Sequence, residues 1–289
     1  MRNRGGPGRR RLAGGLALLL AGLSILLGGA PAQAEPLVDR AQLEAWADSY
    51  YGQAIAEKRT PGITVSVVQA GQVIFAKGYG YADYAKKVPV DAQNTGFIVG
   101  SITKTFLATA IGQLLDRGAI ASLDDPANMY LKRVQLPAAR GATVTIRELL
   151  NHRAGFEDID FGFLAKPLDP HLPLSPSEIK RFMPAIPMKP GGAANYSNWS
   201  FSVLGLLIED ITGQRLDAYL KANIWAPLGM THTSMVYGKY PDNLAKNYVF
   251  ETDGRPVFRP RHLPHPWISP AGTIVSTAAD MGLYMRAQV

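Results

Sequence analysis

The 289-residue sequence contains no cysteine. This absence excludes disulfide bonds, a thiolate nucleophile, cysteine zinc sites and lipid-modified cysteine. Internal repeats and low-complexity runs are also missing beyond the first 34 residues. The fold must therefore be held by packing, and the chain is long enough to bury a sizeable core.

Basic charge is scarce outside the N-terminus. The formal net charge is +7, but residues 1–34 hold five arginines and no acidic residue, and without them the excess is only +2. No cluster of lysine and arginine follows later in the chain. The composition therefore argues against a nucleic-acid partner.

The first 34 residues have the features of a secretory leader. An arginine-rich start precedes an apolar run from Leu12 to Ala30, and Ala32-Gln33-Ala34 fits an A-x-A cleavage site. We predict a signal peptide over residues 1–34, one folded domain over residues 35–289, and a periplasmic or secreted protein. An uncleaved membrane anchor is the alternative, because the apolar run is of borderline length for a span. Only in that case would the protein touch a membrane.

Hydrophobic patterns predict a helix and a hairpin at the start of this domain. Residues 39–58 have a helical pattern, residues 62–68 form a β-branched strand, Ala70-Gly71 makes a turn, and residues 73–80 return as a second strand.

Later segments carry helix signals. Apolar residues at helical spacing predict the strongest helix over residues 101–117, with Gly118 in place for a left-handed cap. Capping boxes at 145–148 and 175–178 open two more helices. An amphipathic stretch over residues 201–211 is stopped by Gly213, and a last helix begins at 277–280 and runs to Val289.

Ser101 and Lys104 are the first candidates for catalysis. On a helix, residues three apart share a face, so an amine would lie beside the hydroxyl. Serine is a poor nucleophile unless a base activates it, and an uncharged lysine can serve. Free N–H groups at the helix start would favour a developing oxyanion. A snorkelling or ion-paired lysine is the alternative for Lys104.

The S-x-x-K spacing alone has little weight, because Ser177 and Lys180 repeat it. There the capping box accounts for Ser177 without catalysis, and Lys180 falls on an ordinary surface helix. The helix that begins at Ser101 differs, because its other faces are almost wholly apolar.

Tyr196-Ser197-Asn198 forms a second candidate cluster, on a loop after Pro190-Gly191-Gly192. A tyrosine hydroxyl beside a lysine can shuttle protons, and an asparagine amide can hold a substrate carbonyl or a lysine. The alternative is a turn in which Asn198 caps the next helix.

Histidines and tryptophans give weaker signals. His152, near a helix end, is more typical of a structural histidine than of a catalytic one. His262 and His265 have a spacing that suits a metal, but no acidic or cysteine ligand accompanies them, so we expect neither metal nor cofactor. Large aromatic side chains usually lie in the core or a pocket wall, and we predict this for Trp199, Trp225 and Trp267.

Taken together, these motifs resemble the serine β-lactamase and penicillin-binding protein superfamily, within its class C-like branch. The resemblance covers almost all of residues 35–289. The matching segments, in chain order, are Pro61-Gly62, Gly100–Phe106, Leu123–Pro126, Ile146–His152, Tyr196–Asn198, Gly205, Thr212-Gly213, Pro227–Met230 and Pro270–Gly272. It implies an α+β fold of the β-lactamase/transpeptidase type, with an antiparallel sheet flanked by helices and a helical subdomain.

The resemblance also implies roles. Ser101 would be the acylated nucleophile, and its backbone N–H would give half of the oxyanion hole. Lys104 and Tyr196 would share general-base and general-acid work, and which of them is the main base stays open. Asn198 would contact the substrate amide and help to place Lys104.

Two departures from the family pattern stand out. Arg153-Ala154 replaces the usual Thr-Ser after the histidine. No K-T-G or H-x-G triplet, the family's third motif, occurs in residues 273–289. We therefore expect that the natural chain continues past Val289, that the C-terminal strands are absent here, and that residues 1–289 alone expose a hydrophobic sheet edge, are poorly stable and nearly inactive.

The function implied is acyl transfer to water through an acyl-enzyme, on a small molecule or a peptidoglycan peptide. The substrate carbonyl could belong to a β-lactam, a D-alanyl peptide or a small ester. The alternative is a catalytically silent penicillin-binding or cell-wall-sensing module, which acylates but deacylates slowly or not at all.

Overall fold

The computed structural model describes residues 38–157, 179–180, 183, 185–237, 239–261 and 266–289. The chain divides into two units, Met1–Leu37 and Val38–Val289, and all described residues belong to the second. The predicted leader, the capping box at 175–178, and His262 and His265 lie outside the described residues. Within the described ranges, no helix has both the length and the apolar character needed to cross a bilayer.

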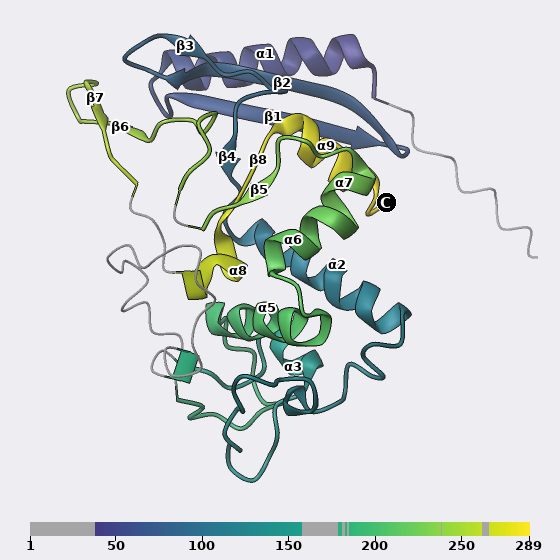
Figure 1. Cartoon of the computed structure of the whole chain (residues 1–289). Coiled ribbons are helices and arrows are strands. Elements are labelled where there is room, and N and C mark those ends of the chain that lie inside the picture. Colours follow the sequence, from purple (N-terminus) through teal and green to yellow (C-terminus); the bar gives the residue numbers. More distant parts are fainter. Residues whose placement is uncertain (1–37, 158–178, 181–182, 184, 238, 262–265) are drawn as a thin grey trace, which may run out of the picture. The chain divides into compact units, whose positions relative to one another are not determined.

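A helix and a hairpin form the N-terminal layer, as predicted. The helix α1 (Arg40–Ala56) begins at Asp39, whose side chain accepts the Gln42 N–H. Strands β1 (Gly62–Gln69) and β2 (Gln72–Asp83) pair antiparallel, and the two turn residues between them have positive φ, as a two-residue hairpin requires. Helices α1 and α9 (Ala278–Arg286) cover opposite faces of this hairpin (Figure 1).

The hairpin belongs to a small antiparallel sheet of order β1-β2-β3, with β3 (Val88–Pro89) beside β2. In the described part of the chain, β1 pairs with β2 alone. A separate hairpin joins β6 (Tyr248–Phe250) to β7 (Pro256–Phe258).

A second, short sheet has the order β4-β8-β5 and was not predicted. It brings together β4 (Phe97–Ile98), the fully buried β8 (Ile274–Ser276) and β5 (Ser234–Met235). Two hydrogen bonds tie it to the segment from Val99 to the start of α2 (Thr103–Asp116): the Val99 N–H donates to the Ile274 carbonyl, and the Ile274 N–H donates to the Thr103 hydroxyl. This sheet therefore fixes the segment that carries Ser101.

Helices make up the rest of the described core, with α2 and α5 (Asn198–Thr212) packed at its centre (Figure 1). Around them lie α3 (Ile146–Leu150), α6 (Leu216–Leu220), α7 (Ala226–Leu228) and α8 (Ser269–Gly272). Short 3-10 or π turns complete the set: η1 (Gly100–Ile102), η2 (Ala127–Met129), η3 (Lys221–Trp225) and η4 (Pro266–Ile268). The three tryptophans named above are buried in this core, as predicted. The architecture is therefore α+β, with antiparallel sheets and a separate helical region.

Helix boundaries follow the capping signals, with three small corrections. The predicted helix over 101–117 starts as the 3-10 turn η1 and becomes α-helical at Thr103. The helix predicted over 201–211 starts earlier, at Asn198. The last helix ends at Arg286, because the next two N–H groups turn back to residues three before them. The capping box of α3 and the left-handed Gly213 after α5 are as predicted.

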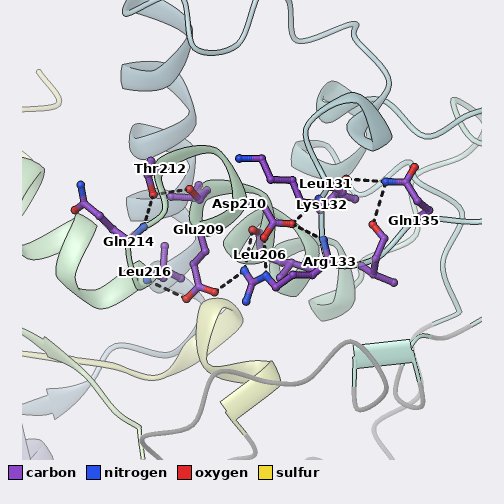
Figure 2. Close-up of polar contacts among 12 residues, drawn as sticks. Leu131, Lys132, Arg133, Gln135, Leu206, Glu209, Asp210, Thr212, Gln214 and Leu216 are labelled. Atoms are coloured by element: carbon purple, nitrogen blue, oxygen red, sulfur yellow. Dashed lines mark hydrogen bonds and ion pairs between the residues drawn. The ribbon is translucent and has the colours of Figure 1, made fainter.

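A polar cluster locks the far end of α5 to the segment 131–135 (Figure 2). The buried Asp210 carboxylate accepts the backbone N–H groups of Lys132 and Arg133 and the Arg133 Nε–H. Arg133 also donates to Glu209, which accepts the Leu216 N–H at the start of α6. These bonds hold α5 in place, and Asn198 lies at the opposite end of this helix.

Candidate active site

Ser101 lies in the η1 turn, directly before α2. Gly100 precedes it with a φ of 56°, a left-handed conformation that suits glycine. The Ser101 side chain is exposed, so a substrate can reach it. No acceptor among the described residues takes the Ser101 N–H. At a helix start, such a free donor can hold a developing negative charge.

Lys104 lies one turn further on and is only 6% exposed. Its Nζ is 3.1 Å from Ser101 Oγ, 2.9 Å from Asn198 Oδ1 and 2.6 Å from the Ala271 carbonyl oxygen. The described residues place no carboxylate in an ion pair with it. The alternative of a snorkelling or ion-paired lysine is therefore wrong, because the amine is buried and bound to neutral oxygens.

Tyr196 brings a second proton-carrying group to the same serine. Its hydroxyl lies 2.8 Å from Ser101 Oγ, and the side chain is 48% exposed. The ring lies over Lys104 Nζ, 5.0 Å from the ring centre, and stacks on His152 at 4.3 Å. Ser101 Oγ is therefore flanked by a phenol on the open side and by an amine on the buried side.

Asn198 is the first residue of α5 and does not cap it. The Ser197 hydroxyl caps the helix by accepting the Ser200 N–H at 3.3 Å. The Asn198 side chain is thus available to Lys104. The structure brings all four predicted residues together, from two segments almost a hundred positions apart in sequence.

Three contacts around this group were not predicted as parts of the site. The Ala271 carbonyl binds Lys104, His152 Nδ1 accepts the Ser197 N–H at 3.1 Å, and the Phe201 ring lies 5.5 Å from Lys104 Nζ. A backbone carbonyl has no signature in sequence. His152 ends the family-like segment Ile146–His152, and Phe201 follows Tyr196–Asn198 by three residues, but only the fold shows what their side chains contact.

The competing candidate sites lack this arrangement. Lys180, the lysine of the second S-x-x-K, is exposed. Among the described residues, no group of three or more histidine, aspartate or glutamate side chains is placed to hold a metal ion. The site as described consists of a hydroxyl, an amine, a phenol and an amide, which together suit nucleophilic attack on a carbonyl.

Comparison with known proteins places this site in a family. The Beta-lactamase family matches residues 47–289. A curated relative, unguisins hydrolase of Aspergillus violaceofuscus, is 32% identical over 251 residues, which is 81% of this chain and 43% of the relative.

Solved structures agree with the match. An octameric penicillin-binding protein homologue from Pyrococcus abyssi is 30% identical with a TM-score of 0.69, covering 86% of this chain and 56% of that one. D-alanine carboxypeptidase AmpC from Burkholderia cenocepacia is 25% identical with a TM-score of 0.65, covering 86% and 65%. This chain spans about half the length of the curated relatives it matches. The chain belongs to the beta-lactamase family, within the superfamily of serine β-lactamases and penicillin-binding proteins.

Proposed function

We propose that the protein is an exported serine hydrolase that acts through an acyl-enzyme on amide or ester carbonyls. The observation that carries this proposal is the position of Ser101 Oγ, 2.8 Å from the Tyr196 hydroxyl and 3.1 Å from Lys104 Nζ. A serine in such a setting has both a base to take its proton and an acid to return one.

The reaction follows from this geometry. Ser101 Oγ attacks the carbonyl carbon as its proton passes to Lys104 or Tyr196, and the Ser101 N–H stabilises the oxyanion. The intermediate collapses, the bond to the leaving nitrogen or oxygen breaks, and the leaving group receives the proton through the exposed Tyr196. Water then attacks the acyl carbon as its proton passes to the same groups, the bond from that carbon to Ser101 Oγ breaks, and Oγ takes up the proton as the carboxylic acid leaves. Asn198 and the Ala271 carbonyl keep the amine in place throughout.

Candidate substrates are a β-lactam, a D-alanyl peptide or a small ester. Support comes from relatives described as a D-alanine carboxypeptidase, a penicillin-binding protein homologue and a hydrolase. Export is supported by the leader that the sequence of residues 1–34 predicts, and it would bring the enzyme to peptidoglycan peptides. N-terminal sequencing of the exported protein should then begin at Glu35.

The test uses the protein as its gene encodes it, with a fluorescent penicillin and a chromogenic ester, beside Ser101→Ala. We expect labelling and turnover in the wild type, and neither in the variant. Stoichiometric labelling without turnover would instead identify a penicillin-binding sensor. Turnover that survives Ser101→Ala would overturn the mechanism.

A further inference from the structure

The loop that carries Tyr196 is fastened to the segment that follows α3. The Gly191 N–H donates to the Arg153 carbonyl at 2.9 Å, and the Asn195 N–H donates to the His152 carbonyl at 2.7 Å. The Asn195 amide also donates to the Phe156 carbonyl at 2.8 Å. Residues 152–156 therefore lie beside residues 188–195 and are hydrogen-bonded to them, although neither segment is a helix or a strand.

The Arg153 side chain adds a clamp between these two segments, formed by its hydrogen bonds to the Gly191 and Gly192 carbonyls. Its Nε donates to the Gly192 carbonyl at 2.7 Å, and its Nη2 donates to the Gly191 carbonyl. A guanidinium presents parallel donors in a rigid fork and can hold two neighbouring oxygens at once. The clamped pair is Gly-Gly, the most flexible dipeptide a chain can have. Arg153 thus restrains the loop at the point where it has least stiffness of its own, four residues before Tyr196.

His152 contacts the Tyr196 ring directly and binds the backbone of the next residue. Its ring stacks on the Tyr196 ring, with centres 4.3 Å apart and planes 27° apart. Its Nδ1 accepts the N–H of Ser197, the residue directly after Tyr196. The backbone of His152 has a φ of 56°, a left-handed conformation that glycine, asparagine, aspartate and histidine adopt more often than other residue types. In this conformation the His152 ring lies against the Tyr196 ring.

We propose that Arg153, together with His152, is a positioning residue that fixes the Tyr196 hydroxyl against Ser101. The inference rests on the proposed acyl-enzyme function, since it assigns Tyr196 to proton transfer. Among the contacts of the described residues, neither side chain is hydrogen-bonded to Ser101 or Lys104. A displacement of the phenol by ~1 Å would break its bond to Ser101 Oγ and slow proton transfer.

A double-mutant cycle tests the proposal through chemistry. Arg153→Ala should slow acylation by about tenfold to a hundredfold with KM little changed, because the loss falls on orientation and not on binding. In a Tyr196→Phe background, Arg153→Ala should add nothing further, because the clamp acts through the phenol. Arg153→Lys, with one ammonium for two carbonyls, should recover part of the rate. Losses that simply add in the double variant would overturn the proposal.

Arg147→Ala is the matched control. Arg147 lies six residues earlier and also makes two hydrogen bonds, to the exposed Asp124 carboxylate. It should leave acylation unchanged. An equal loss in this control would mean that the Arg153 effect is a general loss of stability, and it would overturn the assignment.

Hydrogen exchange tests the clamp without any reaction. Arg153→Ala should speed amide exchange in residues 191–198, and Arg147→Ala should not. His152→Asn keeps a side-chain acceptor and suits the positive φ, but it removes the ring. It should therefore keep the Ser197 N–H protected from exchange and still slow acylation. If the wild type shows no acylation, the proposed function fails while exchange still decides on the clamp. Unchanged exchange in Arg153→Ala overturns the clamp itself.

Discussion

Lys104 joins three parts of the site through a single amine. Its hydrogen bonds reach η1 at Ser101, α5 at Asn198 and α8 at Ala271. Lys104→Met should lower the acylation rate by about a thousandfold, since positioned proton transfer contributes on the order of 10²–10⁴. Burst kinetics with a chromogenic ester measure this rate.

Lys180→Met is the matched control, because Lys180 has the same S-x-x-K spacing and is exposed. It should react like the wild type. A comparable loss in both variants would contradict the role assigned to Lys104.

The residues of the site differ in how far sequence predicts them. The apolar helix after Ser101 and the ordered motifs identified Ser101, Lys104 and Tyr196, because these signals lie in local sequence. Local sequence alone left Asn198 between capping and catalysis, since both uses fit a residue at a helix start, and only the resemblance assigned it to the substrate amide and to Lys104. The Ala271 carbonyl and the Arg153 clamp depend on segments that meet only in the fold, so no local pattern announces them.

At the scale of elements, α5 and α8 approach each other closely at Gly205. A Cβ added there would lie 2.7 Å from Pro270 Cγ and 2.8 Å from Pro270 Cβ. Gly205→Ala should destabilise the protein by about 1–3 kcal/mol, as overpacking does, and push α8 away from α5. The Ala271 carbonyl would move with α8, so acylation should slow as well. Thermal unfolding and burst kinetics check the two effects.

Gly112→Ala is the control for that prediction. Gly112 also lies inside a helix, but a Cβ there would meet no atom within 4 Å. The substitution should raise stability by about 0.5–1 kcal/mol through helix propensity alone. Destabilisation of both variants to the same degree would argue against a steric contact between α5 and α8.

The polar cluster at the end of α5 makes a second prediction at this scale (Figure 2). Asp210 is 6% exposed and accepts three N–H groups. Asp210→Ala should cost about 3 kcal/mol, because a partly buried Arg133 and two backbone donors lose their acceptor. Asp253→Ala, which removes an exposed ion pair with Arg255, should cost less than about 1 kcal/mol. Urea unfolding of the two variants measures the difference.

Elements differ in predictability for a physical reason. Helices α1 and α3 and the β1–β2 hairpin carry their signals within a few residues: caps, a β-branched run and a two-residue turn. The sheet β4-β8-β5 has strands of two or three residues that pair across long separations, such as Phe97 with Ser276. No period can be recognised in so short a strand, so this sheet was missed although it anchors Ser101.

At the scale of the whole described unit, an ion pair between the buried Asp83 and the exposed Lys246 joins the hairpin to the later part of the chain. Asp83, at the end of β2, is bound by Lys246 Nζ at 2.6 Å, by the Tyr248 hydroxyl and by the Lys86 N–H. The neighbouring Lys246 N–H also donates to the Ala82 carbonyl. The hydrogen bond from Lys246 is the main cause that lowers the pKa of Asp83 from 3.8 to about 2.

This depressed pKa makes stability depend on pH in a defined direction. The ionised Asp83 stabilises the fold fully above about pH 4, where the unfolded chain is ionised too, and the contribution disappears as pH falls through about 2. Asp83→Asn should therefore lower Tm at pH 7, and the gap to the wild type should close between about pH 4 and 2. Asp242→Asn, at an exposed pair with Lys239, should lower Tm little at any pH. If the Tm difference between the wild type and Asp83→Asn stays constant down to pH 2, then packing, and not the charge of Asp83, holds the hairpin to the segment around Lys246.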